Sequence, residues 1–233
     1  MTSEGCGFKI LERGFKETLV LVPGWATDYR IFSLLDLNYN YIFPEKPDPL
    51  DFNDKLLSFL NKKSMGKVSL FGWSMGGFLA VEFALKNSGR VDELILLGIR
   101  KSFDPKVLDE VRKKILEDRK AYLSKFYLSF FSEGEGEGLA WFRRNLLKGY
   151  LEEMSQAGLM AGLDYLSRAR IDSGSLASIK RVRVFHGTED RIAPFKEAEE
   201  IKDSLPGLNL VSMPAAGHAV FLSRGFKERF ENG

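Results

Sequence analysis

The fold of this chain is decided by the stretch Leu70-Phe71-Gly72-Trp73-Ser74-Met75-Gly76-Gly77. The apolar run 68–71 predicts a buried strand, and the apolar segment that follows the stretch predicts a helix. The Gly-x-Ser-x-Gly pattern between them is typical of a sharp strand-to-helix turn that exposes a serine hydroxyl. Gly72 and Gly76 have no side chains to collide where strand and helix meet. We therefore expect Ser74 to be a nucleophile at the carboxyl edge of a sheet.

Length and composition limit the possible function classes. The chain has 233 residues, enough for one α/β domain with an insertion. The 34 Lys and Arg residues nearly balance 32 Asp and Glu residues, so no overall positive field indicates a nucleic-acid partner. Cys6 is the only cysteine and there are two histidines, so neither an internal disulfide nor a zinc site is expected.

No targeting or membrane segment is expected from the sequence. Residues 1–7 lack the basic start and apolar centre of a signal peptide. No apolar run approaches the roughly 20 residues that cross a bilayer. A single cysteine also suits a reducing compartment. We therefore expect a cytoplasmic protein that contacts neither membrane nor nucleic acid.

Strand and helix patterns alternate along most of the chain. Strands are predicted at 8–11, 17–22, 39–43, 68–71, 91–97, 182–185 and 208–211. Helices are predicted from Asp51, after Ser74, near 194–204 and at about 219–230. Such alternation favours a parallel sheet with right-handed crossovers.

One long segment interrupts this alternation. Residues 101–179 have helical periodicity and no convincing strand, and the Glu-Gly alternation of 133–138 predicts a flexible acidic break. We predict a mostly parallel central sheet flanked by helices, formed by residues 1–100 and 180–233. Residues 101–179 are expected to form a helical cap inserted over the carboxyl edge of that sheet.

A serine hydroxyl becomes an effective nucleophile only when a positioned base takes its proton. The candidate bases are the two histidines. His218 lies between the last predicted strand and the last predicted helix, at the same sheet edge as Ser74. His186 ends the preceding strand and is expected to hold its own loop by a backbone hydrogen bond. The order of the segments therefore favours His218 as the base.

The base needs an acid that orients its ring. The loop after the strand 182–185 offers Glu189 and Asp190, and Asp190 is preferred because this loop is expected to turn inward there. The order Ser74, Asp190, His218 is that of Ser-Asp-His hydrolases, with each residue following a different strand. The alternative is that either carboxylate only caps the helix near Pro194.

A tetrahedral intermediate also needs two fixed donors for its negative oxygen. The N–H of Met75 is one candidate, because it begins the helix after Ser74. The loop 23–25 supplies the other, since Gly24 lets the backbone approach closely and the N–H of Trp25 follows it. We predict an oxyanion hole made by Trp25 and Met75.

Together these features resemble the α/β-hydrolase superfamily over nearly the whole chain. Within it the chain resembles the pimeloyl-[acyl-carrier protein] methyl ester esterases of biotin synthesis. The segments that carry this likeness are 21–25, 72–77, 125–128, 157–166 and 217–223. The chain departs from the pattern in having Pro23-Gly24 where His-Gly is usual, in reversed charges at 170–172 and in a shorter N-terminal edge.

The resemblance implies hydrolysis of a methyl ester on an acyl chain bound to acyl carrier protein, with no cofactor. Trp25 and Phe126 are expected to line an apolar slot for the methylene chain, with Tyr127 and Phe130 as further candidates. The alternative for each is that its side chain only packs in the core of the cap. Acyl carrier proteins are acidic, so a basic docking patch is expected. The cluster Arg143, Arg144 and Lys148 is the candidate, although such clusters are often only solvated helix faces.

Two other classes of function remain open on the sequence. One is a general esterase for small free esters, or a C–C hydrolase or cofactor-free peroxidase with the same three residues. The other is a non-catalytic binding protein of the same fold, which usually lacks one of the three.

Overall fold

The computed structural model describes residues 7–45, 48–205 and 207–233, so Cys6 and the rest of residues 1–6 lie outside the described residues. The described strands form one seven-stranded sheet in the order β1-β3-β2-β4-β5-β6-β7. Only β1 is antiparallel to its neighbour, and all other pairs are parallel. The strands are β1 (Phe8–Leu11), β2 (Thr18–Val22), β3 (Asn40–Pro44), β4 (Val68–Trp73), β5 (Val91–Leu97), β6 (Val182–Gly187) and β7 (Asn209–Met213).

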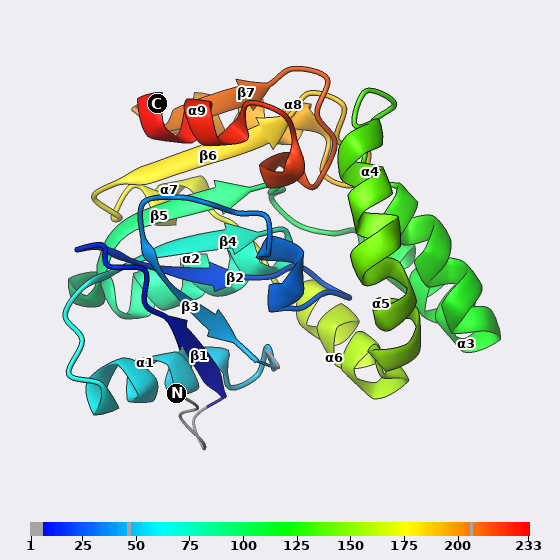
Figure 1. The fold of residues 1–233 in the computed structure, drawn as a ribbon, viewed down its shortest axis with the longest axis horizontal. Coiled ribbons are helices and arrows are strands. Elements are labelled where there is room, and N and C mark those ends of the chain that lie inside the picture. Colours follow the sequence, from blue (N-terminus) through cyan, green and yellow to red (C-terminus); the bar gives the residue numbers. More distant parts are fainter. Residues whose placement is uncertain (1–6, 46–47, 206) are drawn as a thin grey trace.

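Helices pack around the sheet and beyond its carboxyl edge. They are α1 (Phe52–Lys62), α2 (Met75–Lys86), α3 (Pro105–Leu128), α4 (Gly136–Phe142), α5 (Lys148–Glu153), α6 (Gln156–Leu166), α7 (Ser173–Leu176), α8 (Phe195–Asp203) and α9 (Phe226–Asn232). The arrows of β2, β4 and β5 point towards α3–α6, which stand together at one end of the molecule (Figure 1). We call α3–α6 the cap; the division into a core and an inserted cap of residues 101–179 stays a prediction.

The central strands are buried on both faces, which explains their continuous apolar runs. Every residue of β4 is buried. Phe71 faces α9, where its ring lies 6.2 Å from that of Phe226 and 6.3 Å from that of Phe230. Gly72, the next residue, faces α2 on the opposite side, because a side chain there would meet Ala80 of α2.

The cap helices contain two irregularities. Asp118 has φ −151° and ψ 93°, which breaks α3, and its carboxylate restarts the helix by accepting a hydrogen bond from the Ala121 N–H. A π-helical segment, Arg143–Leu147, joins α4 to α5, so residues 136–153 form one continuous rod. The flexible break expected at 133–138 is therefore wrong in part, because residues 136–138 belong to α4.

Most predicted strands and helices are confirmed within a residue or two, and a second prediction is wrong in part. Residues 219–230 do not form one helix: Val220–Leu222 is a 3-10 turn, and α9 begins at Phe226. The backbone leaves helical geometry at Ser223, which is extended (φ −77°, ψ 152°), and again at Gly225, whose φ of 80° lies in the left-handed region. Within the described ranges, every helix is too short or too polar to reach across a bilayer.

Phe71 offers a test of this packing. Replacing it by Ala should lower the free energy of unfolding by about 3–5 kcal/mol, because a fully buried ring is lost between β4 and α9. Urea unfolding measures the change. Phe15→Ala is the control, since Phe15 is 36% exposed and should cost less than about 1 kcal/mol. Equal losses for both variants would contradict the proposed role of Phe71 in the core.

Candidate active site

Ser74 lies between β4 and α2 in a conformation that serine rarely adopts. Its φ is 54° and its ψ is −120°. A non-glycine residue at positive φ is strained by about 1–3 kcal/mol and persists only where its surroundings hold it. The Ser74 N–H donates to the Leu97 carbonyl of β5 at 2.9 Å, and its carbonyl accepts from Gly77 at 2.8 Å. The turn is therefore fixed by the strand beside it and by the helix it begins.

The two glycines of the motif allow this turn to close. A side chain at Gly72 would lie 2.6 Å from the Gly76 carbonyl oxygen. A side chain at Gly76 would lie 2.1 Å from the Val22 carbonyl oxygen and 2.6 Å from that of Pro23. Such distances are impossible for a real Cβ atom, so glycine at position 72 lets α2 pack on β4, and glycine at position 76 lets the start of α2 approach the end of β2.

His218 and Asp190 meet at the same edge of the sheet. The Nδ1 atom of His218 lies 2.7 Å from Oδ2 of Asp190, and both residues are buried. Because the carboxylate can only accept, Nδ1 carries the proton and leaves Nε2 as the basic nitrogen. The backbone carbonyl of His218 accepts from the Trp73 indole N–H at 2.9 Å, next to Ser74. Gly98 gives the imidazole room, since a side chain there would lie 2.9 Å from Nδ1.

The carboxylate of Asp190 is held by its own loop. Its Oδ1 accepts hydrogen bonds from the N–H groups of Ile192 and Ala193, both at 2.8 Å. Burial by itself would raise the pKa of Asp190, but the imidazoles of His218 and His186 lower this pKa well below its usual range. Glu189, the alternative acid, points to solvent, and it is Asp190 that the structure brings to His218.

His186 lies on the other side of Asp190. Its Nε2 is 2.7 Å from the Ala193 carbonyl oxygen and 3.4 Å from Oδ2 of Asp190. The ring is fully buried, and its Nδ1 has no partner among the described residues. The predicted backbone hydrogen bond of His186 is therefore confirmed, and this histidine supports the acid loop.

The predicted oxyanion donors flank Ser74. A side chain at Gly24 would lie 3.2 Å from the Cβ atom of Ser74, so the loop after β2 packs directly on the serine. Within the described ranges, the N–H groups of Trp25 and Met75 donate to no protein acceptor. Two unpaired N–H groups beside a serine can bind a developing negative oxygen.

The hydrogen bond expected between the Ser74 hydroxyl and the His218 imidazole is not formed in this structure. Among the described residues, the Ser74 hydroxyl makes no hydrogen bond to His218. Hydrogen bonds of this kind are often long before substrate binds and tighten in the reacting complex. The assignment of Ser74, Asp190 and His218 as a catalytic triad therefore remains a prediction at this stage.

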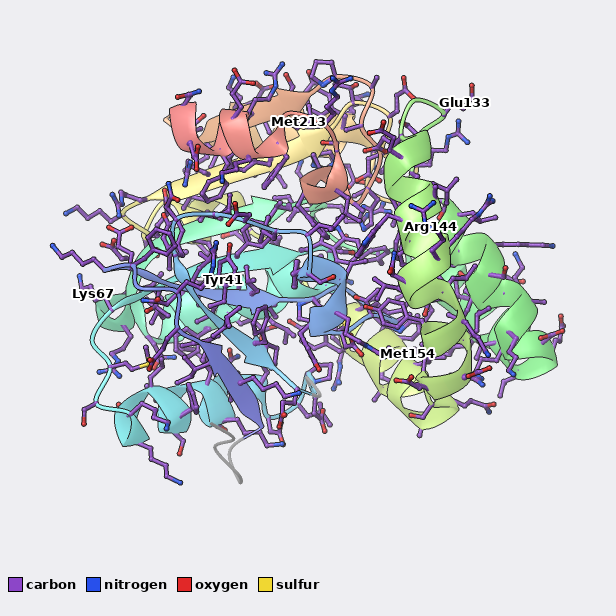
Figure 2. The ribbon with its side chains drawn as sticks, in the orientation of Figure 1. Tyr41, Lys67, Glu133, Arg144, Met154 and Met213 are labelled. Atoms are coloured by element: carbon purple, nitrogen blue, oxygen red, sulfur yellow. The ribbon has the colours of Figure 1, made fainter. Side chains whose placement is uncertain are left out.

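A cavity of about 550 Å³ opens between the loop after β2 and the cap. Its wall includes Trp25, which donates its indole N–H to the Leu159 carbonyl of α6 at 2.9 Å, and Met75. Figure 2 labels Met154, another wall residue, at the C-terminal end of α5. The other lining residues are Gly24, Ala26, Thr27, Asp28, Arg30, Glu45, Pro49, Glu153, Ser155, Gly158, Leu159 and Gly162.

The predicted aromatic contacts divide into two groups. Trp25 lines the cavity, whereas Phe126, Tyr127 and Phe130 are absent from its lining. The Phe126 ring lies 5.0 Å from the Trp25 ring, and Tyr127 is fully buried with its hydroxyl donating to the Ala26 carbonyl at 2.7 Å. Phe130 lies 5.1 Å from Trp73 and 5.9 Å from His218. Substrate contact by these three cap residues stays a prediction.

The predicted docking cluster lies on the rod of α4, the π segment and α5, where Figure 2 labels Arg144. Arg143, Arg144 and Lys148 are all exposed. Among the described carboxylates, none forms an ion pair with any of the three. Gly149, which follows Lys148, lies close to the cavity wall, because a side chain there would lie 3.4 Å from Nη1 of Arg30.

Two polar features of the site were not predicted from the sequence. Arg30 binds Asp28 at 2.7 Å and Glu153 of α5 at 2.8 Å, which joins the loop after β2 to the cap. Glu135, from the segment expected to be a flexible break, accepts a hydrogen bond from Gly217 beside His218. Spacing could not reveal the bonds of Arg30 to Glu153 and of Glu135 to Gly217, because these partners lie far apart in the sequence.

Gly162 of α6 tests the contact between the cap and Trp25. A side chain there would lie 2.4 Å from Cδ1 of Trp25, so Gly162→Ala should destabilise the protein by about 1–3 kcal/mol and shift its Trp fluorescence. Gly158→Ala in the same helix is the control. Gly158 is exposed, and a side chain there would meet only the Ser155 hydroxyl at 3.1 Å, so the change in stability should be smaller than at Gly162. A Gly162→Ala variant as stable as wild type would contradict the close packing.

Comparison with known proteins gives the family. A family model described as alpha/beta hydrolase fold matches residues 23–224. A pimeloyl-[acyl-carrier protein] methyl ester esterase from Nitrosomonas europaea is 30% identical over 78% of this chain and 75% of its own length. The AB hydrolase superfamily protein YisY of Bacillus subtilis is 30% identical over 94% of this chain and 91% of its own length.

The solved structures agree on the fold. A bromoperoxidase from Bacillus anthracis superposes with a TM-score of 0.81 at 19% identity, covering 97% of this chain and 93% of that one. At this identity the likeness concerns the fold alone, and it confirms the predicted mostly parallel sheet with flanking helices. The chain belongs to the alpha/beta hydrolase family, and within it resembles the pimeloyl-[acyl-carrier protein] methyl ester esterases.

Proposed function

We propose that this protein is a serine carboxylesterase in which Ser74, His218 and Asp190 act together. The observation that carries the proposal is the 2.7 Å contact between His218 and Asp190 at the sheet edge where Ser74 is held at positive φ. The unpaired N–H groups of Trp25 and Met75 support it, because acyl transfer requires donors for a negative oxygen.

In the proposed first half of the reaction, the Ser74 hydroxyl attacks the ester carbonyl carbon. Nε2 of His218 takes the hydroxyl proton, and Asp190 stabilises the imidazolium that results. The carbonyl oxygen becomes negative and is held by the N–H groups of Trp25 and Met75; each such donor is worth about 3 kcal/mol of barrier. The intermediate then collapses, the C–O bond to the alcohol breaks, and the imidazolium protonates the leaving oxygen.

In the second half, water replaces the alcohol. His218 takes a proton from this water while the water oxygen attacks the acyl-serine carbonyl. Collapse of the second intermediate returns the proton to Ser74 and releases the carboxylic acid, which ionises at neutral pH. For a methyl ester the two products are methanol and a carboxylate.

We propose the methyl ester of pimeloyl-[acyl-carrier protein] as the substrate, which assigns the protein to biotin synthesis in the cytoplasm. The name of the Nitrosomonas europaea relative supports this choice. The cavity of about 550 Å³ falls in the range of small-ligand sites, and Trp25, Met75 and Leu159 give it apolar walls for a methylene chain. A general esterase for small free esters is the alternative of the same class.

We propose that Arg143, Arg144 and Lys148 dock the acidic carrier protein. Their exposure and lack of ion pairs with described carboxylates leave three positive charges available to a partner. Charges of this kind steer association and fix orientation more than they add affinity. Gly149, the residue after Lys148, lies against Arg30 on the cavity wall, which suits an acyl chain that enters from a carrier docked on this helix.

The triad assignment predicts a graded loss of activity on p-nitrophenyl and methyl esters. Ser74→Ala should lower kcat by about 10⁶-fold, because the nucleophile is removed. Asp190→Asn should lower kcat by about 10⁴-fold, because the imidazole is left in the wrong tautomer. Glu189→Gln, one residue away and exposed, is the matched control and should stay within about twofold of wild type.

The result that would contradict this assignment is an Asp190→Asn variant as active as Glu189→Gln. A fluorophosphonate probe that leaves Ser74 unlabelled in folded wild-type protein would likewise exclude Ser74 as the nucleophile. Ligand binding by wild-type protein without any turnover would instead indicate a non-catalytic member of the family.

The docking cluster predicts a difference between two substrates. Arg143→Glu with Arg144→Glu should raise KM for a carrier-bound methyl ester by about tenfold or more and leave KM for a free methyl ester unchanged. Equal effects on both esters would exclude docking by these residues.

The decisive test of the substrate is growth without biotin of a strain that lacks its methyl esterase. Wild-type protein should restore growth, whereas Ser74→Ala should not.

A further inference from the structure

Glu135 occupies an unexpected place at the junction of the cap and the core. Its Oε2 atom accepts a hydrogen bond from the Gly217 N–H at 2.7 Å and another from the Ser132 N–H at 2.8 Å. Gly217 directly precedes His218, the proposed base. One carboxylate of the cap therefore holds the backbone from which the imidazole extends.

The loop around His218 is held on both sides by the same cap segment. The Ala219 N–H donates to the Phe130 carbonyl at 3.0 Å, and the Ser132 hydroxyl donates to the Ala215 carbonyl. Gly217 fits against this segment so closely that a side chain there would lie 2.6 Å from the Phe130 carbonyl oxygen. The end of α3 and the residues after it thus form a support for the base loop.

The burial of Glu135 distinguishes it from its neighbours in the Glu-Gly run. Glu133 is 93% exposed, whereas Oε1 of Glu135 is buried with no partner among the described residues. Burial raises the pKa of Glu135, and the N–H groups of Ser132 and Gly217 oppose that rise. A carboxylate is costly to bury, and hydrogen bonds to a charged acceptor are the strong ones. The Gly217 bond is therefore a specific contact rather than the chance position of a surface side chain.

We infer that Glu135 is a positioning residue that fixes the His218 loop through Gly217 and so links the cap to the base. The inference rests on the proposed esterase activity. Small displacements of a catalytic group can slow a reaction by large factors, because proton transfer needs close and aligned partners. Glu135 acts on the position of the imidazole and does not touch the substrate, so its loss should change kcat and leave KM nearly unchanged.

The experiment compares three variants with a small soluble ester, which avoids any effect on carrier docking. Glu135→Ala removes the acceptor, Glu135→Gln keeps an oxygen at the same place, and Glu133→Ala is the matched control in the same acidic run. Rates are divided by the concentration of protein that elutes as a single species with the wild-type circular dichroism spectrum, so that only folded protein is counted. Thermal unfolding of each variant is measured in parallel.

We expect Glu135→Ala to lower kcat by about tenfold with KM within about twofold of wild type. Glu135→Gln should restore kcat to within about threefold, because its amide oxygen can accept both N–H groups. Glu133→Ala should match wild type. A Glu135→Ala variant with wild-type kcat, or a Glu135→Gln variant as slow as Glu135→Ala, would overturn the inference.

If Glu135→Ala does not fold, Ser132→Ala provides the second measurement. This variant loses the hydroxyl bond to Ala215 on the same loop and should also lower kcat more than KM; unchanged kcat would overturn the inference. Failure of the proposed function has a different signature, since wild-type protein would then hydrolyse no ester at all.

Discussion

The close approach of the first turn of α2 to the end of β2 is the constraint on which the site depends. The main chain at Gly76 lies where any side chain would meet the Val22 carbonyl oxygen at 2.1 Å. This contact brings the Met75 N–H beside the loop that carries the Trp25 N–H, and it leaves Ser74 at positive φ. The strain of about 1–3 kcal/mol is small against the burial of β4 and α2, which therefore can hold the serine in place.

The second constraint is the burial of the Asp190 charge. A carboxylate taken out of water needs several hydrogen bonds to compensate for lost solvation. Ile192, Ala193 and His218 supply them, so the same bonds that make the charge tolerable also fix the orientation of the imidazole. A donor and an acceptor that are oriented before substrate binds need no reorganisation during the reaction. The stability of this loop and its proposed chemistry thus have one physical origin.

Local patterns in the sequence predicted most of the fold, because continuous apolar runs indicate buried strands and Gly-x-Ser-x-Gly indicates a sharp strand-to-helix turn. They also predicted which residues would reach the carboxyl edge, since Asp190 and His218 each follow a strand. The helix expected at 219–230 was wrong because the spacing of apolar residues does not reveal that Gly225 adopts a left-handed conformation. The role of Glu135 was missed because the Glu-Gly composition around it suggests a free loop, while its partner Gly217 lies 82 residues away.

The contacts of the cap indicate what it contributes beyond covering the cavity. Tyr127 of α3 donates a buried hydrogen bond to the carbonyl of Ala26, whose φ of 61° is strained for a residue with a side chain. A bond worth about 0.5–1.5 kcal/mol offsets much of a strain of about 1–3 kcal/mol. The loop of the proposed oxyanion hole therefore owes part of its shape to the cap.

Because the same helix leads into the segment that holds the His218 loop, a cap that swung fully away would disturb both halves of the site. Substrate entry by movement of a few side chains around the cavity is more compatible with these contacts than displacement of the whole cap.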